Sequence, residues 1–156
     1  MKYQDFVKVF EDAANAYVPT PPNNNLSFHY DYVWYNNGAA ANDYPSMLFE
    51  CSPDFDFKGI SHTGRTGRQR FQGKLFFYDT FWESEKAVKK AYEKQSELNE
   101  LANQILVKVY NDLLAKGVSI QWGKGFMGKD VHNPRLVQVF VPFTAEIPQD
   151  CTVLPT

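Results

Sequence analysis

The chain contains few cysteines, no long apolar run and no large excess of either charge. Cys51 and Cys151 lie far apart and form no C-x-x-C pair, which argues against a disulfide framework or a zinc site and indicates two free thiols in a reducing compartment. No run reaches the roughly 20 apolar residues that a membrane-spanning helix needs. Residues 1–17 are amphipathic and charged, so we expect no signal peptide and a protein made in the cytoplasm.

The balanced charge gives no overall attraction to nucleic acid or membranes, because 16 Lys and Arg residues face 18 Asp and Glu residues. Aromatic side chains, in contrast, are abundant, with nine tyrosines and thirteen phenylalanines. Rings in that number can fill a core, and they also suit protein interfaces, where one side is buried and a polar edge stays wet. The 156 residues are enough for a single domain that folds without metals or disulfides.

Hydrophobic periodicity predicts two helices. Apolar residues at three-and-four spacing indicate a short helix over residues 3–17 and a long amphipathic helix over residues 81–116, which Gly117 ends. The apolar stripe thins near residues 95–96, so the pattern is compatible with a continuous helix or with a kink there.

Period-two alternation predicts strands in the rest of the chain. These strands cover residues 26–35, 47–51, 54–58, 68–79, 118–122 and 135–143. The third and fourth are the arms of a long hairpin with its tip near residues 62–67, and its acidic arm pairs with its basic arm. Prolines predict extended segments at 18–25 and 144–156. The predicted fold is α+β, a mostly antiparallel sheet with a long hairpin, packed against one long amphipathic helix and a short N-terminal helix.

The stretch GKGFMGKD, residues 123–130, is one substitution from a P-loop pattern and contains a complete G-x-G-x-x-G pattern. Both patterns need a helix directly after the loop, but Pro134 prevents one, and Asp130 places a carboxylate where a phosphate would bind. We therefore expect no nucleotide cofactor and interpret the stretch as a hairpin loop whose glycines adopt positive φ angles. Phe126 and Met127 are then displayed at the loop tip as a protein contact.

A basic segment extends from residue 58 to residue 74, without an acidic residue between its ends. Its cations are Lys58, Arg65, Arg68, Arg70 and Lys74. On a strand, neighbouring same-face positions lie about 6 to 7 Å apart, a spacing that can follow a phosphate backbone or meet an acidic partner. The alternative is a solvated hairpin edge whose charges prevent edge-to-edge aggregation, and the sequence favours this alternative.

Catalytic and metal-binding candidates are few. His29, His62 and His132 stand in different segments, with no neighbour at ligand spacing. Asp54 and Asp56 resemble paired carboxylates, but on a strand they form an exposed charged row. No nucleophile elbow is present. We therefore expect no enzyme and no metal site.

The order of elements resembles that of small tail-completion or tail-terminator proteins of tailed bacteriophages. Two stretches carry the likeness: LFFYDTFWESEK (75–86), in which Phe77, Tyr78 and Asp79 end a strand, and the following helix ELNELANQILVKVYNDLL (97–114). This form is similar to versions from phages of gut Bacteroidetes.

The resemblance implies a non-enzymatic virion component, assembled in the host cytoplasm, that forms a homo-oligomeric ring of six or twelve subunits in the neck or tail. Such a ring joins the portal and connector to the tail around the DNA channel. The basic hairpin and the two extended segments would then contact neighbouring subunits, other neck proteins or the DNA. The alternative function is a nonspecific nucleic-acid-binding module that uses residues 58–74.

Overall fold

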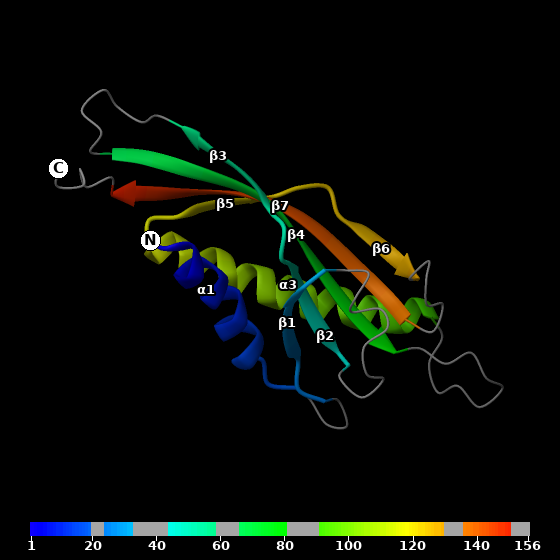
Figure 1. Cartoon of the computed structure of the whole chain (residues 1–156). Coiled ribbons are helices and arrows are strands. Elements are labelled where there is room, and N and C mark those ends of the chain that lie inside the picture. The colour runs from blue at the N-terminus through cyan, green and yellow to red at the C-terminus, as the bar shows by residue number, and fades with distance from the viewer. Residues whose placement is uncertain (20–23, 33–43, 59–65, 81–90, 130–135, 151–156) are drawn as a thin grey trace.

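A computed structural model describes residues 1–19, 24–32, 44–58, 66–80, 91–129 and 136–150. Two helices lie on one face of a seven-stranded sheet (Figure 1). The helices are α1 (Tyr3–Asn15) and α3 (Ala91–Ala115). The strands are β1 (Ser27–Asp31), β2 (Ser46–Glu50), β3 (Asp54–Lys58), β4 (Thr66–Thr80), β5 (Ser119–Trp122), β6 (Phe126–Lys129) and β7 (Leu136–Asp150). The predicted α+β class, with a short and a long helix on a mostly antiparallel sheet, is confirmed.

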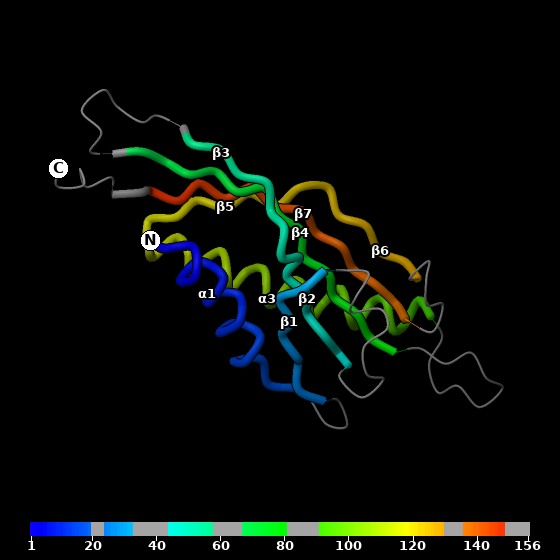
Figure 2. Tube along the Cα trace, viewed as in Figure 1, coloured from blue at the N-terminus to red at the C-terminus, as the bar shows by residue number. Residues whose placement is uncertain are grey.

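The sheet is built around one long antiparallel ladder between β4 and β7. All fifteen residues of each strand are paired, from Thr66 opposite Asp150 to Thr80 opposite Leu136. At about 3.4 Å per residue, each strand is about 50 Å long. Figure 2 shows the two strands running side by side through the molecule as a twisted pair. The ladder therefore sets the length of the molecule and positions every other strand.

Shorter strands flank this ladder on both sides. β2 and β3 lie beside β4, and β6 and β5 lie beside β7, all in antiparallel orientation. β1 adds to β2 in parallel orientation. The pairing of β3 with β4 confirms the predicted hairpin arms, while most of the predicted tip, including Arg65, lies outside the described residues.

The main core lies between the helices and the inner face of the sheet, the face that the helices cover. Rings from α1, β2 and β7 meet there: Phe6 and Phe10 lie 5.2 Å apart between centroids, Phe10 and Phe49 5.1 Å, and Phe49 and Phe143 5.5 Å. All four side chains are buried. Part of the aromatic excess of the sequence is therefore used in this core, where such pairs add to the burial of apolar area.

A smaller apolar cluster lies on the outer face of the sheet, the face opposite the helices. It consists of Leu48, Phe76, Tyr78 and Leu136, with Phe140 packed against it. The rings of Phe76 and Phe140, on neighbouring strands, lie 5.0 Å apart. The end of the ladder that contains Leu136 is thus apolar on both faces.

α3 ends where the sequence predicts. Gly117 has a φ of 73°, and its N–H donates to Leu114 O at 3.0 Å, while the Val118 N–H donates to Leu113 O at 3.0 Å. These two bonds form a Schellman motif, which needs a residue with positive φ at this position. The helix is continuous through residues 95–96. The predicted first part of this helix, residues 81–90, lies outside the described residues.

Residues 144–150 correct one prediction. They are extended, but they form the second half of β7 and not a separate arm. Ala145 and Ile147 are buried in the core, and Thr144 and Glu146 alternate with them on the outer face. Residues 151–156 of the predicted segment lie outside the described residues, as do residues 20–23 of the segment at 18–25.

The prolines of β7 are compatible with the ladder because the backbone N–H that they lack would point away from β4. Pro142 O accepts a hydrogen bond from Gly123 N at 2.7 Å, on the side of β7 where β5 and β6 lie. Since the N and O of a strand residue point to the same side, the missing N–H also points there, into the gap between β5 and β6. Pro148 is six residues further and has the same orientation, beyond the end of β5. Neither proline therefore removes a bond to β4.

Candidate functional site

The predicted basic segment lies partly along the outer face of β4. Arg68 and Lys74 are exposed and Arg70 is half-buried, whereas the intervening Phe71 faces the core. The predicted shared face of these cations is confirmed. Lys58 stands opposite Arg68 in the register of β3 and β4.

Carboxylates from both neighbouring strands lie among these cations. Arg70 Nη2 lies 3.0 Å from Asp56 Oδ2 on β3, and Arg68 Nη1 lies 3.3 Å from Glu146 Oε2 on β7. The predicted pairing between an acidic and a basic hairpin arm is therefore confirmed by the contact between Asp56 and Arg70. A phosphate backbone would meet carboxylates as well as guanidinium groups on this face, which lowers its electrostatic attraction.

The glycine-rich stretch contains a strand, which rules out a phosphate-binding loop. Residues Phe126–Lys129 form β6 and pair with β7, from Phe126 opposite Phe140 to Lys129 opposite Val137. An extended strand cannot wrap its amides around a phosphate as a P-loop does. The predicted loop tip at Phe126 and Met127 is therefore wrong, although both side chains are exposed as predicted.

The glycines before β6 provide space and not positive φ angles. Among the described residues, positive φ occurs only at Gly117. A Cβ at Gly123 would lie 2.9 Å from Pro142 Cγ, and one at Gly125 would lie 2.9 Å from Phe140 O. The prediction of positive φ is therefore wrong: these glycines let the β5–β6 connection run close against β7.

Two strands with a free edge expose large apolar side chains. Phe126 and Met127 on β6 are 56% and 49% exposed, and Phe55 and Phe57 on β3 are 60% and 57% exposed. Within the described parts of the chain, β3 pairs only with β4 and β6 only with β7, so each has one unpaired edge. Natural sheets usually protect such edges with charges or a covering segment. Exposed apolar side chains beside an unpaired edge indicate contact with another protein.

Phe55 and Phe57 were not among the predicted contact residues. Phe55 stands opposite Phe71, and their rings lie 6.1 Å apart; the Phe71 ring in turn lies 5.0 Å from that of Tyr3 at the start of α1. The exposed rings therefore extend the core aromatic row past α1. The alternation in Asp54–Lys58 was a usable signal, since it places two aromatic residues on one side of a short strand.

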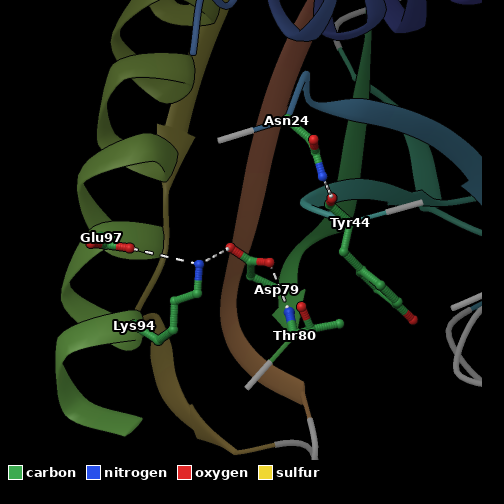
Figure 3. Close-up of polar contacts among 6 residues, drawn as sticks. All are labelled: Asn24, Tyr44, Asp79, Thr80, Lys94 and Glu97. Carbon is green, nitrogen blue, oxygen red and sulfur yellow. Dashed lines mark hydrogen bonds and ion pairs between the residues drawn. The ribbon is translucent and has the colours of Figure 1, made fainter. Parts of the chain in front are cut away.

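A separate polar pocket lies at the other end of β4 (Figure 3). Lys94 Nζ on α3 lies 3.1 Å from Asp79 Oδ2 and 3.7 Å from Glu97 Oε2. The Thr80 N–H donates to Asp79 Oδ1 at 2.8 Å. The pocket has a volume of about 200 Å³, and its other polar lining residues are Tyr17, Asn24 and Tyr44. Asn24 Nδ2 donates a hydrogen bond to the backbone O of Tyr44 at 3.4 Å.

This pocket has the features of a structural clamp. Asp79 Oδ2 accepts a hydrogen bond from Lys94, which joins α3 to β4, and Asp79 Oδ1 accepts one from the Thr80 N–H of its own strand, which orients the carboxylate. The sequence pattern does not predict the contact between Asp79 and Lys94, because the two residues lie on separate elements fifteen positions apart.

Other polar groups support packing. The Tyr3 hydroxyl lies 3.2 Å from that of Tyr30, which donates to Cys51 O at 3.3 Å. Burial and the contact with Tyr30 raise the pKa of Tyr3 above its usual value, so its phenol stays protonated at neutral pH. Cys51 is a free thiol, and Cys151 lies outside the described residues.

The described residues contain neither a candidate metal site nor a membrane-spanning helix. No group of three His, Cys, Asp or Glu side chains lies close enough together there to hold a metal ion. His29 lies half-buried on β1, and His62 and His132 lie outside the described residues. No described helix is long and apolar enough to cross a membrane.

Comparison with protein-family models gives no match, and comparison with curated proteins gives none either. The function is therefore inferred from the exposed strand edges and from the order of elements.

Proposed function

We propose that this chain is a non-enzymatic structural subunit of a virion, which assembles with copies of itself into a ring in the neck or tail of a tailed bacteriophage. The ring joins the portal and connector to the tail around the DNA channel. The resemblance to tail-completion and tail-terminator proteins supports the virion assignment. Of the residues that carry this resemblance, Phe77, Tyr78 and Asp79 lie at the end of β4, and residues 97–114 lie within α3.

Self-assembly is supported by one observation above all: a free strand edge with exposed apolar side chains occurs on both sides of the sheet. Unpaired edges bind other strands through their backbone groups, and the neighbouring side chains decide which strand is bound. A protein with two such edges can bind one neighbour on each side. Repeating that contact builds a ring or a filament.

The size of the apolar contribution sets the expected strength of assembly. Complete burial of a Phe or Met side chain contributes about 1.5–3 kcal/mol, so burying the exposed halves of Phe55, Phe57, Phe126 and Met127 contributes about 3–6 kcal/mol per joint. Association costs about 4–15 kcal/mol in lost freedom of motion. Apolar burial alone is therefore not enough, and we expect the isolated protein to assemble only at high concentration or on a neck or tail partner.

Assembly is tested by measuring the molar mass of the purified full chain by light scattering over a wide concentration range, with electron microscopy of the largest species. We expect ring-shaped oligomers, and a smaller oligomer fraction for the variant Phe57→Ser with Met127→Ser. Val107→Ser is the matched control, because Val107 is 60% exposed but lies on α3 and not on a strand. A chain that stays monomeric at every concentration and also fails to join purified neck proteins contradicts the proposal.

The nucleic-acid-binding alternative has a test of its own. The ion pairs of Arg68 and Arg70 with carboxylates weaken it, so we expect no DNA binding at moderate salt. Binding that decreases steeply with salt, and that is lost in the variant Arg68→Ala with Arg70→Ala, would support the alternative.

A further inference from the structure

We infer that the copies join head to tail, with β6 of one copy pairing with β3 of the next copy, so that the sheet continues across the joint. This inference rests on the proposed self-assembly, and it specifies the two surfaces that meet.

The first support is the position of the two strands. β3 lies beside β4 along residues 68–72, whereas β6 lies beside β7 along residues 137–140, which face residues 76–79 of β4. The free edges therefore lie on opposite sides of the ladder and at opposite ends of it (Figure 2). A contact between two different surfaces is heterologous and continues from copy to copy, whereas β3 on β3 would form an isolated dimer and leave β6 uncovered.

The second support is strand direction. β3 runs antiparallel to β4, and β6 runs antiparallel to β7. Because β4 and β7 are themselves antiparallel, β3 and β6 point in opposite directions. If the helices of two joined copies lie on the same side of a continued sheet, β6 and the next β3 meet in antiparallel orientation, which is the orientation of every pair in this sheet except β1 with β2.

The third support is the match between the side chains that β3 and β6 carry on the inner side of the sheet. Phe55 stands opposite the core residue Phe71, and Met127 stands opposite the core residue Val139, so both lie on the inner side of the sheet. Phe57 shares that side with Phe55. In a continued sheet, side chains on the same side of neighbouring strands contact each other. Methionine packs well against aromatic rings, so the inner sides are complementary.

Disulfide cross-linking tests the joint. In a background with Cys51→Ser and Cys151→Ser, we combine Met127→Cys with Phe55→Cys or with Phe57→Cys, since neighbouring strands bring facing residues within disulfide range. These three positions are exposed, so the variants keep the core intact. Under mild oxidation, a chain with both cysteines should give a ladder of covalent oligomers. A mixture of two single-cysteine chains should give dimers that contain one chain of each kind.

The controls separate this inference from the proposed function. Phe55→Cys combined with Phe57→Cys, without the change at Met127, tests a joint between two copies of β3, and Val107→Cys on α3 measures random collision. Light scattering on the cysteine-free background reports assembly independently. If that background forms rings while neither combination with Met127→Cys cross-links above the Val107→Cys level, the head-to-tail joint is wrong and the proposed function stands. Cross-linked dimers from the pair at Phe55 and Phe57 also overturn it. If the background does not assemble, alone or with purified neck proteins, the proposed function fails as well.

Discussion

The two halves of β4 differ sharply although they form one strand. From Leu75 to Tyr78 every side chain is buried, because the inner face packs on the main core and the outer face belongs to the second apolar cluster. Between Arg68 and Lys74 burial alternates, with Phe71 inside and charged side chains outside. β2, which pairs with β1 on its other edge, flanks the buried half around residues 75–78. β3, which has a free edge, flanks the half around residues 68–72. Stability is therefore concentrated in one half of the strand and surface chemistry in the other.

The largest effect is expected from removing a buried ring in the apolar half of β4. Phe77→Ala should lower the free energy of unfolding by about 3–5 kcal/mol, because it empties a fully buried site between the sheet and the helices. Phe57→Ala removes the same ring from the exposed edge and should change stability by less than about 0.5 kcal/mol. Urea unfolding of dilute protein measures both. Equal costs at the two positions would show that β3 is part of the core.

The junction between the two halves should be the next most sensitive position. Gly73→Ala should cost about 1–3 kcal/mol, because its Cβ would lie 2.3 and 2.6 Å from two atoms of the Phe143 ring, which is itself held in the core. Lys74→Ala, at the neighbouring exposed position, is the control and should be nearly neutral. Thermal unfolding of both variants decides whether the ring can move aside without cost.

The clamp at the end of the buried half should have an intermediate effect. Lys94→Met should cost about 1–2 kcal/mol, because it leaves the mostly buried carboxylate of Asp79 without its cation. Lys108→Met breaks a more exposed pair with Asp112, of equal length, and should cost only about 0.3–0.5 kcal/mol. A double-mutant cycle with Asp79→Asn measures the coupling directly, and a coupling near zero would rule out the clamp.

The smallest effect is expected in the exposed half. Asp56→Asn removes the ion pair with Arg70 and should cost less than about 1 kcal/mol, an amount that shrinks at high salt because the pair is partly exposed. Unfolding measured at low and high salt sharpens the comparison. A large, salt-independent loss would place this pair in a buried environment.

The sequence predicts the local elements well, because their signals depend on neighbouring residues. The spacing of Phe6, Phe10 and Ala13 defines α1, and Gly117 defines the end of α3. It also predicts the hairpin of β3 and β4, where opposite charges and turn residues agree. In each case, the information that determines the element lies within a few residues of it.

The errors arise where distant segments decide the conformation. The prolines at 142 and 148 indicate an irregular tail, but they are tolerated because β5 and β6 leave the corresponding side of β7 unpaired. The glycines at 123 and 125 indicate a turn, whereas their small size is what matters against β7. No local pattern predicts which strand passes beside these residues. The sequence does not identify Phe55 and Phe57 as exposed for the same reason, since the exposure of β3 depends on where the helices end.

The long ladder also controls how the chain folds. Paired residues of β4 and β7 are separated by 56 to 84 positions, from 136 minus 80 to 150 minus 66. Such distant pairing closes a large loop before any contact repays its entropy, and this slows folding relative to helical proteins of similar size. On the ribosome, β4 is synthesised before β7, so the phenylalanines of β4 stay exposed until β7 has been made. Aggregation during synthesis is therefore a greater risk for this chain than its native surface suggests.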